Sequence, residues 1–151
     1  MATFTATDLG KYILGTWILE SYQSFSIDGS DGRHPFGPDS KGILMYTADG
    51  YMSAQIMRPD RPHFHTRDLR SVDTDELATA ADGYFAYSGP YTVSEQGLVV
   101  HYVDVSLVPN WVGETQYRAA EIGDSRLQLS PTQPVLNDGQ RRNLRFVWRR
   151  P

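Results

Sequence analysis

Hydrophobic and polar residues alternate with a period of two along most of this chain, which is typical of β-strands with one buried face. Short turns rich in glycine, aspartate and asparagine separate the alternating runs, and Asp49-Gly50 marks the clearest hairpin. The predicted strands span residues 15–27, 43–47, 51–57, 84–93, 98–107, 113–121, 126–130 and 142–149. About eight antiparallel strands can close into a barrel whose mouth holds one small ligand.

Two segments break the strand pattern and are predicted to contain helices. Residues 7–14 form a short helix that Thr7 or Asp8 can cap. The connection over residues 58–83 begins with prolines, which disfavour regular structure, and ends in a short helix capped by Thr74. A connection of this length in a compact domain is often a lid or a binding loop.

The expected fold class is therefore all-β: an eight-stranded antiparallel barrel with a short N-terminal helix and one long helix-containing loop. A chain of 151 residues without repeats or linkers is expected to form a single domain over residues 1–151. Pro90 cannot donate to a strand ladder, which predicts an edge, a bulge or a bend at that point. An exposed edge there would make a homodimer a reasonable assembly.

The strand over residues 98–107 places a histidine at the head of an aliphatic row. Alternation puts His101, Val103, Val105 and Leu107 on one face, which should look into a core or a cavity. An imidazole titrates near neutral pH, so His101 inside a cavity could act as a general acid or base. The alternative is a core histidine that is hydrogen-bonded to its neighbours.

Other strands supply candidate ligand contacts on their inward faces. Aromatic and aliphatic side chains alternate with polar ones there, and a buried phenol can hold a substrate oxygen or donate a proton. The alternative for each is ordinary core packing. The candidates are Ala54, Ile56, Phe85, Tyr87 and Tyr91, with Tyr46 weaker because residues 43–47 are apolar on both faces.

The amino-acid composition restricts the possible binding partners of the protein more than it restricts the fold. Nine tyrosines, six phenylalanines and three tryptophans suit walls that are both apolar and hydrogen-bonding. A net charge of −4 without a basic stripe argues against nucleic acid. The lack of cysteine excludes disulfides and thiolate chemistry and fits a reducing cytoplasm. The N-terminal residues show no signal-peptide or membrane-span pattern, and no phosphate-loop or dinucleotide motif indicates a cofactor.

Several motifs resemble the lipocalin-like domain family. Gly15-Thr16-Trp17, after a short helical turn, is similar to the Gly-x-Trp signature of lipocalins. Three further runs, KGILMYTADGYMSAQIMRP, GYFAYSGPYTV and HYVDVSLVPNWVGETQYR with GDSRLQLS, resemble the bacterial and fungal members. The resemblance implies a closed or nearly closed barrel with an internal pocket. It also implies a late arginine over Trp17, for which Arg145 and Arg149 are the candidates.

The same resemblance bears on Gln116, Arg118 and Trp111. Polarity alone would send Gln116 and Arg118 outward, whereas a Gln-x-Arg pair recurs in the family after the Pro-Asn-Trp corner, which implies that they face inward. An inward guanidinium could bind a carboxylate or an enolate. Trp111 could stack on a ligand at the mouth or plug one end of the barrel.

His63-Phe64-His65 suggests a metal site or a lid. Two histidines at i and i+2 in an extended segment share a face, and His101 or Asp60 could complete a zinc site. No established metal-binding spacing supports this, so no metal is expected, and Phe64 is instead a candidate lid contact.

Three functional hypotheses follow, because fold does not decide function. The first is a barrel that binds a small, largely apolar or aromatic molecule and performs cofactor-free proton transfer on it, as an isomerase, cyclase or lyase of secondary metabolism. His101 would move the proton, Tyr87 or Tyr91 would hold an oxygen and Arg118 would stabilise negative charge. The alternative is a non-catalytic carrier of a hydrophobic metabolite. The third is a small structural or interaction domain with a filled core.

Overall fold

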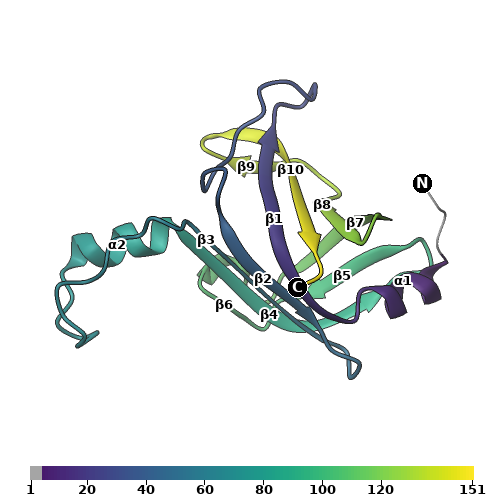
Figure 1. Ribbon diagram of the computed structural model, residues 1–151, viewed down its shortest axis with the longest axis horizontal. Helices are drawn as coiled ribbons and strands as arrows, with labels where there is room; N and C mark the ends of the chain where they lie inside the picture. The colour runs from purple at the N-terminus through teal and green to yellow at the C-terminus, as the bar shows by residue number, and fades with distance from the viewer. Residues whose placement is uncertain (1–4) are drawn as a thin grey trace.

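A computed structural model of the protein describes residues 5–151 and shows a closed antiparallel barrel (Figure 1). The barrel closes because β1 pairs with both β2 and β10. Its eight long strands run in the order β1-β2-β3-β4-β5-β7-β8-β10, which confirms the predicted eight-stranded architecture. The elements are α1 (Ala6–Tyr12), β1 (Gly15–Phe25), β2 (Lys41–Tyr46), β3 (Tyr51–Met57), α2 (Thr74–Asp82), β4 (Tyr84–Val93), β5 (Leu98–Tyr102), β6 (Val105–Ser106), η1 (Pro109–Trp111), β7 (Thr115–Gly123), β8 (Arg126–Pro131), β9 (Val135–Asn137) and β10 (Gln140–Arg149).

One of these strands was not predicted, and another was predicted only as part of a longer strand. The three-residue β9, which was not predicted, pairs with the start of β10, and the two-residue β6, which lies within the predicted strand over residues 98–107, pairs with β4. The segment that contains β9 reads as a polar loop, since three residues are too few to establish an alternating pattern. It nevertheless lies against the barrel, where it helps to form the functional site described below.

A bulge in β1 changes which side chains face inward along that strand. Alternation alone predicts that Trp17, Leu19 and Phe25 share one face. Trp17 and Leu19 are buried as this predicts, but the pairing with β10 shifts register between Leu19 and Ser21. Since an extra residue reverses the alternation, Tyr22 points inward, whereas Phe25 lies under the guanidinium of Arg145.

The predicted strand over residues 98–107 is also interrupted. β5 ends at Tyr102, and β6 starts with Val105, which is 62% exposed, while Leu107 is 43% exposed. Only His101 and Val103 of the predicted inward row are therefore buried. A Cβ atom on Gly89 of β4 would lie 1.9 Å from the Tyr102 carbonyl oxygen, so the interruption depends on this close backbone approach.

Pro90 is not at an exposed edge, which corrects one of the expectations for it. It pairs with Tyr51 of β3 inside the closed barrel. On its other side the ladder changes partner, from β6 at Ser88 to β5 at Tyr91, so the predicted irregularity is present as a gap in pairing. The edge argument for a homodimer therefore does not hold, and a homodimer stays an untested prediction.

The N-terminal helix packs against one end of the barrel through Trp17. Thr5, rather than Thr7 or Asp8, caps α1, and the Trp17 indole donates to the Ile13 carbonyl at 2.8 Å. The arginine over Trp17 is Arg150, and neither predicted candidate occupies that position.

The second helix lies away from the barrel. Figure 1 shows α2 and its flanking loop projecting from the ends of β3 and β4. Asp73 precedes it as the N-cap residue in place of the predicted Thr74. Within residues 5–151, neither helix has the length and apolar content needed to cross a membrane.

Candidate functional site

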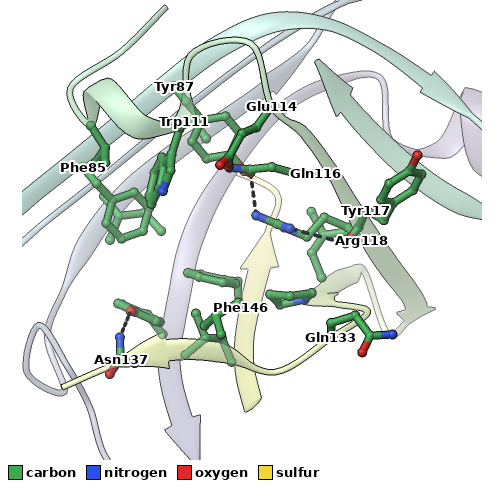
Figure 2. Close-up of a pocket in the computed structure, with 18 of the residues that line it drawn as sticks. Phe85, Tyr87, Trp111, Glu114, Gln116, Tyr117, Arg118, Gln133, Asn137 and Phe146 are labelled. Carbon is green, nitrogen blue, oxygen red and sulfur yellow. Dashed lines mark hydrogen bonds between the residues drawn. The ribbon is translucent and has the colours of Figure 1, made fainter. Parts of the chain in front are cut away.

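A cavity of about 830 Å³ lies inside the barrel, and Figure 2 shows part of its lining. This volume is in the range of small-molecule sites, which are usually a few hundred to about a thousand Å³. Side chains from most of the barrel strands and from three connecting segments contribute to it.

One side of the cavity is aromatic and aliphatic. β1, β8 and β10 contribute it, and the Tyr22 and Phe146 rings stack with centroids 4.6 Å apart. Burial raises the pKa of Tyr22 to about 12, so this phenol is neutral at physiological pH. The residues of this side are Tyr22, Leu129, Leu144, Phe146 and Trp148. Such a surface suits the flat face of an aromatic ligand.

The Trp148 indole N–H, behind this side of the cavity, is a buried donor without a partner in the described residues. Trp148 is 3% exposed and lines the cavity, and its N–H has no hydrogen-bond partner within residues 5–151. A buried donor without a partner costs about 1–3 kcal/mol, so an acceptor that reached it would be bound favourably.

Polar side chains from β7 form the other side of the cavity. Gln116 and Arg118 both point inward, as the family pattern implied and against the expectation from polarity alone. The Arg118 guanidinium donates to the Gln116 amide oxygen at 2.7 Å, and Figure 2 shows the pair across the cavity from Phe146. Arg118 forms no ion pair with an acidic residue in the described part of the chain. Its charge is therefore available to an electron-rich ligand oxygen.

His101 lies behind this wall and does not line the cavity. It is 1% exposed, and its two ring nitrogens are hydrogen-bonded to phenols: Nε2 to Tyr46 at 2.7 Å and Nδ1 to Tyr87 at 3.2 Å. Burial, with the nearby positive charge of Arg118, holds the His101 pKa well below its usual range. The expectation of an inward, buried ring is confirmed, but the ring reaches the cavity only through Tyr87.

The other predicted residues fall into three groups. Those that line the cavity are Ala54, Ile56, Phe85, Tyr87, Trp111, Gln116 and Arg118. Those that are buried or half-buried behind the lining are Tyr46, Tyr91, Val103 and His101. Phe64 forms the third group: it sits in the loop before α2 and does not line the cavity, and its role as a lid contact stays a prediction.

Trp111 packs within the lining rather than filling the barrel. Its ring meets Phe85 and Tyr87 edge to face, with centroids 5.7 and 5.8 Å away. η1 holds it at the corner before β7, and the cavity lies beside it. Trp111 therefore has the position expected of a residue that contacts a ligand, and it does not close the end of the barrel.

The two loop histidines do not come together as a metal pair. The His65 Nδ1 atom lies 2.6 Å from a Glu76 carboxylate oxygen, and Asp73 is close to both. His63, Asp60 and His101 do not belong to this group, which is largely exposed and lies outside the cavity lining. The arrangement is that of a loop fastened to α2 by an ion pair.

Two loop segments that were not predicted from the sequence also line the cavity. Pro35 and Phe36 come from the connection between β1 and β2, and residues 132–137 come from the connection between β8 and β10 that contains β9. Arg142, 1% exposed, fastens the first loop by donating to the Ser24 carbonyl and to the Asp31 carboxylate. A buried arginine among polar loop residues is not visible from alternation, because nothing local indicates its partners.

Comparison with known proteins agrees with this architecture. The family model of the lipocalin-like domain matches residues 14–151 of the chain. The chain is also similar to the 4'-hydroxy-3'-methoxypropiophenone carrier protein of Aspergillus oryzae, with 37% identity over 106 residues. That match covers 66% of this chain and 96% of the relative. With its closed barrel, internal cavity and matching sequence, this chain belongs to the lipocalin-like domain family.

Proposed function

We propose that the protein is a non-catalytic carrier that holds one small, largely aromatic molecule inside the barrel. The observation that carries this proposal is the cavity of about 830 Å³, which is mostly apolar and has a few polar groups in fixed positions. This combination is typical of sites that bind drug-sized organic molecules. The aromatic side would pack on the ligand ring, and the polar side would orient its oxygen atoms.

The polar groups restrict the chemistry of the ligand. Arg118 offers a guanidinium that has no acidic partner in the described residues and is held by the Gln116 amide oxygen. A guanidinium is a donor only, so it favours a ligand with carbonyl, phenolate or carboxylate oxygens. An apolar hydrocarbon would give this charge no acceptor beyond those that the protein already supplies.

The fungal relative supports the same class of ligand. Its name describes the carriage of an aryl ketone with phenol and methoxy substituents, and the match covers almost its whole length. An aromatic ring with a short ketone side chain is also what the aromatic and donor-rich sides of the cavity would accept. We therefore propose an aryl ketone or a related phenylpropanoid as cargo.

Proton-transfer catalysis has less support than carriage. His101 is buried behind the cavity lining, and both of its ring nitrogens are engaged by phenols. A pKa held well below the usual range leaves the ring neutral, and a general base must reach the proton that it removes. Catalysis by proton transfer would need Tyr87, which lines the cavity, to transfer the proton in place of His101.

The direct test is binding without conversion. Purified protein is titrated with 4'-hydroxy-3'-methoxypropiophenone by calorimetry and tryptophan fluorescence, because Trp111 and Trp148 line the cavity. We expect saturable one-to-one binding, with the compound recovered unchanged when it is analysed by mass spectrometry. Absence of binding, or conversion of the compound, would contradict the carrier proposal.

Two arginine variants test whether the ligand binds in the cavity beside Arg118. Arg118→Leu should weaken binding by about tenfold to a hundredfold, the usual range for a hydrogen bond to a charged group. Arg126→Leu is the control, because Arg126 pairs with Glu20 and does not line the cavity. Equal affinities in the two variants would exclude Arg118 from the site.

A further inference from the structure

Three hydrogen-bonding rings form a continuous row from the core to the cavity. The Tyr46 hydroxyl lies 2.7 Å from His101 Nε2, and His101 Nδ1 lies 3.2 Å from the Tyr87 hydroxyl. Tyr46 and His101 are each 1% exposed, whereas Tyr87 lines the cavity. Only Tyr87 can therefore contact a bound molecule.

The histidine gives this row a direction. A neutral imidazole has one N–H and one lone pair, so it donates to one phenol and accepts from the other. Burial and the charge of Arg118, which lower the His101 pKa, keep the ring neutral. Two arrangements are then available, and they differ in whether Nε2 or Nδ1 carries the proton.

Tyr46 selects between the two arrangements. Its hydroxyl has no hydrogen-bond partner except His101 in the part of the chain that the structure describes. If Nε2 carried the proton, the Tyr46 O–H would be buried without an acceptor, which costs about 1–3 kcal/mol. Tyr46 therefore donates to Nε2, and the proton of the ring is on Nδ1.

The same reasoning then applies to Tyr87. Nδ1–H donates to the Tyr87 oxygen, which leaves the Tyr87 O–H free to donate elsewhere. Within residues 5–151 this hydroxyl has no other hydrogen-bond partner, and the side chain borders the cavity. The available acceptor is an atom of the molecule that occupies the cavity.

We propose that Tyr46 and His101 are positioning residues that hold Tyr87 as a hydrogen-bond donor to a ligand carbonyl oxygen. This inference rests on the proposed carrier function and makes it more specific. It selects ketones over molecules that have a methylene, which cannot accept a hydrogen bond, at the same place. The Arg118 guanidinium reinforces the preference, because the cavity then offers a second group of donors to oxygen acceptors.

The first experiment reads the His101 tautomer directly. ¹⁵N-labelled protein is studied by NMR as wild type, Tyr46→Phe and Tyr91→Phe. Tyr91→Phe is the matched control, because that phenol packs on Tyr46 but donates to the Thr47 carbonyl. We expect protonated Nδ1 and bare Nε2 in wild type and in the control, and a mixture of tautomers in Tyr46→Phe. A wild-type ring protonated on Nε2 would overturn the proposal.

The second experiment measures selectivity with two probes that differ at one group: propiophenone and propylbenzene, in which a methylene replaces the carbonyl. The ratio of their dissociation constants cancels most effects on packing. Tyr87→Phe should reduce the preference for the ketone by about fivefold to tenfold, the usual value of one hydrogen bond. Tyr46→Phe should reduce it in part, and Tyr91→Phe should leave it unchanged.

The outcomes separate this inference from the carrier function. If wild-type protein binds neither probe, the carrier proposal and the ketone contact both fail, while the NMR result still decides the direction of the row. If both probes bind and Tyr87→Phe keeps the ketone preference, only the inference fails. An unchanged preference in Tyr46→Phe would exclude the positioning role of Tyr46, because that residue does not touch the cavity.

Discussion

The Arg150 guanidinium lies over the Trp17 indole, with its central carbon 3.7 Å from the ring centroid. The same guanidinium donates to the Tyr12 carbonyl at 2.6 Å and to the Thr16 carbonyl at 3.1 Å. One side chain after β10 therefore fastens α1 and the start of β1, at the place where the first and last long strands close the barrel.

Removing this contact should destabilise the barrel. We expect Arg150→Ala to lower the free energy of unfolding by about 2 kcal/mol, since it removes a cation–π contact and two charged hydrogen bonds. Arg149→Ala is the control, because Arg149 is exposed and should change stability by less than about 0.5 kcal/mol. Urea denaturation of both variants measures the difference, and similar midpoints would contradict the role of Arg150.

Gly89 should tolerate no side chain. Its added Cβ atom would lie 1.9 Å from the Tyr102 carbonyl oxygen, which is backbone and cannot rotate away. We expect Gly89→Ala to cost about 3 kcal/mol, the upper end of overpacking. Gly123→Ala should change little by comparison, because nothing lies within 4 Å of the corresponding atom there. Thermal unfolding of the two variants tests this, and equal melting temperatures would refute the close approach.

Arg142 should hold the loop that brings Phe36 to the cavity. Arg142→Ala removes a buried charge together with the donors to Ser24 and Asp31, so we expect a loss of about 3 kcal/mol. Amide hydrogen exchange should increase over residues 26–37. Arg141→Ala, at the exposed neighbouring position, should leave exchange there unchanged. Unaltered exchange in Arg142→Ala would mean that other contacts order the loop.

Acid should destabilise the protein through His101. The folded pKa lies well below the ordinary value of 6.5, so the unfolded chain binds more protons below pH 6.5. The stabilising contribution is complete above that pH and is lost as the pH falls toward the folded pKa. Arg118→Gln should reduce this loss, since the Arg118 charge is one cause of the lowered pKa. Unfolding free energies from pH 7.5 to 4.5 measure the slope.

His65 provides the control for this pH experiment. The Glu76 carboxylate raises the His65 pKa, so this exposed pair stabilises its loop below pH 6.5 and loses that effect as the pH rises through the raised value. The sign is opposite to that of His101. His65→Gln should therefore leave the acid loss in place, and its disappearance in that variant would assign the acid sensitivity to the loop.

Much of the barrel could be predicted from alternation, because which face of a strand a residue occupies is a local property. Ala54, Ile56, Phe85 and Tyr87 were placed correctly on this basis, and all four line the cavity. The prediction was wrong at the bulge after Leu19 and at the end of β5 at Tyr102. The first depends on pairing with β10, which is distant in sequence, and the second on the close approach of the Gly89 backbone in β4.

The site itself depended more on tertiary structure. Local periodicity identified the strands, the inward phenols and a buried histidine, because side chains on a pleated strand must alternate. It could not show that Tyr87 covers His101, that Arg150 rather than its neighbours reaches Trp17, or that two loops complete the cavity wall. Those relationships join residues on different strands and loops, from 14 positions apart for Tyr87 and His101 to opposite ends of the chain for Trp17 and Arg150. They are decided by how the closed sheet brings distant strands and loops together, and no local pattern along the chain records that arrangement.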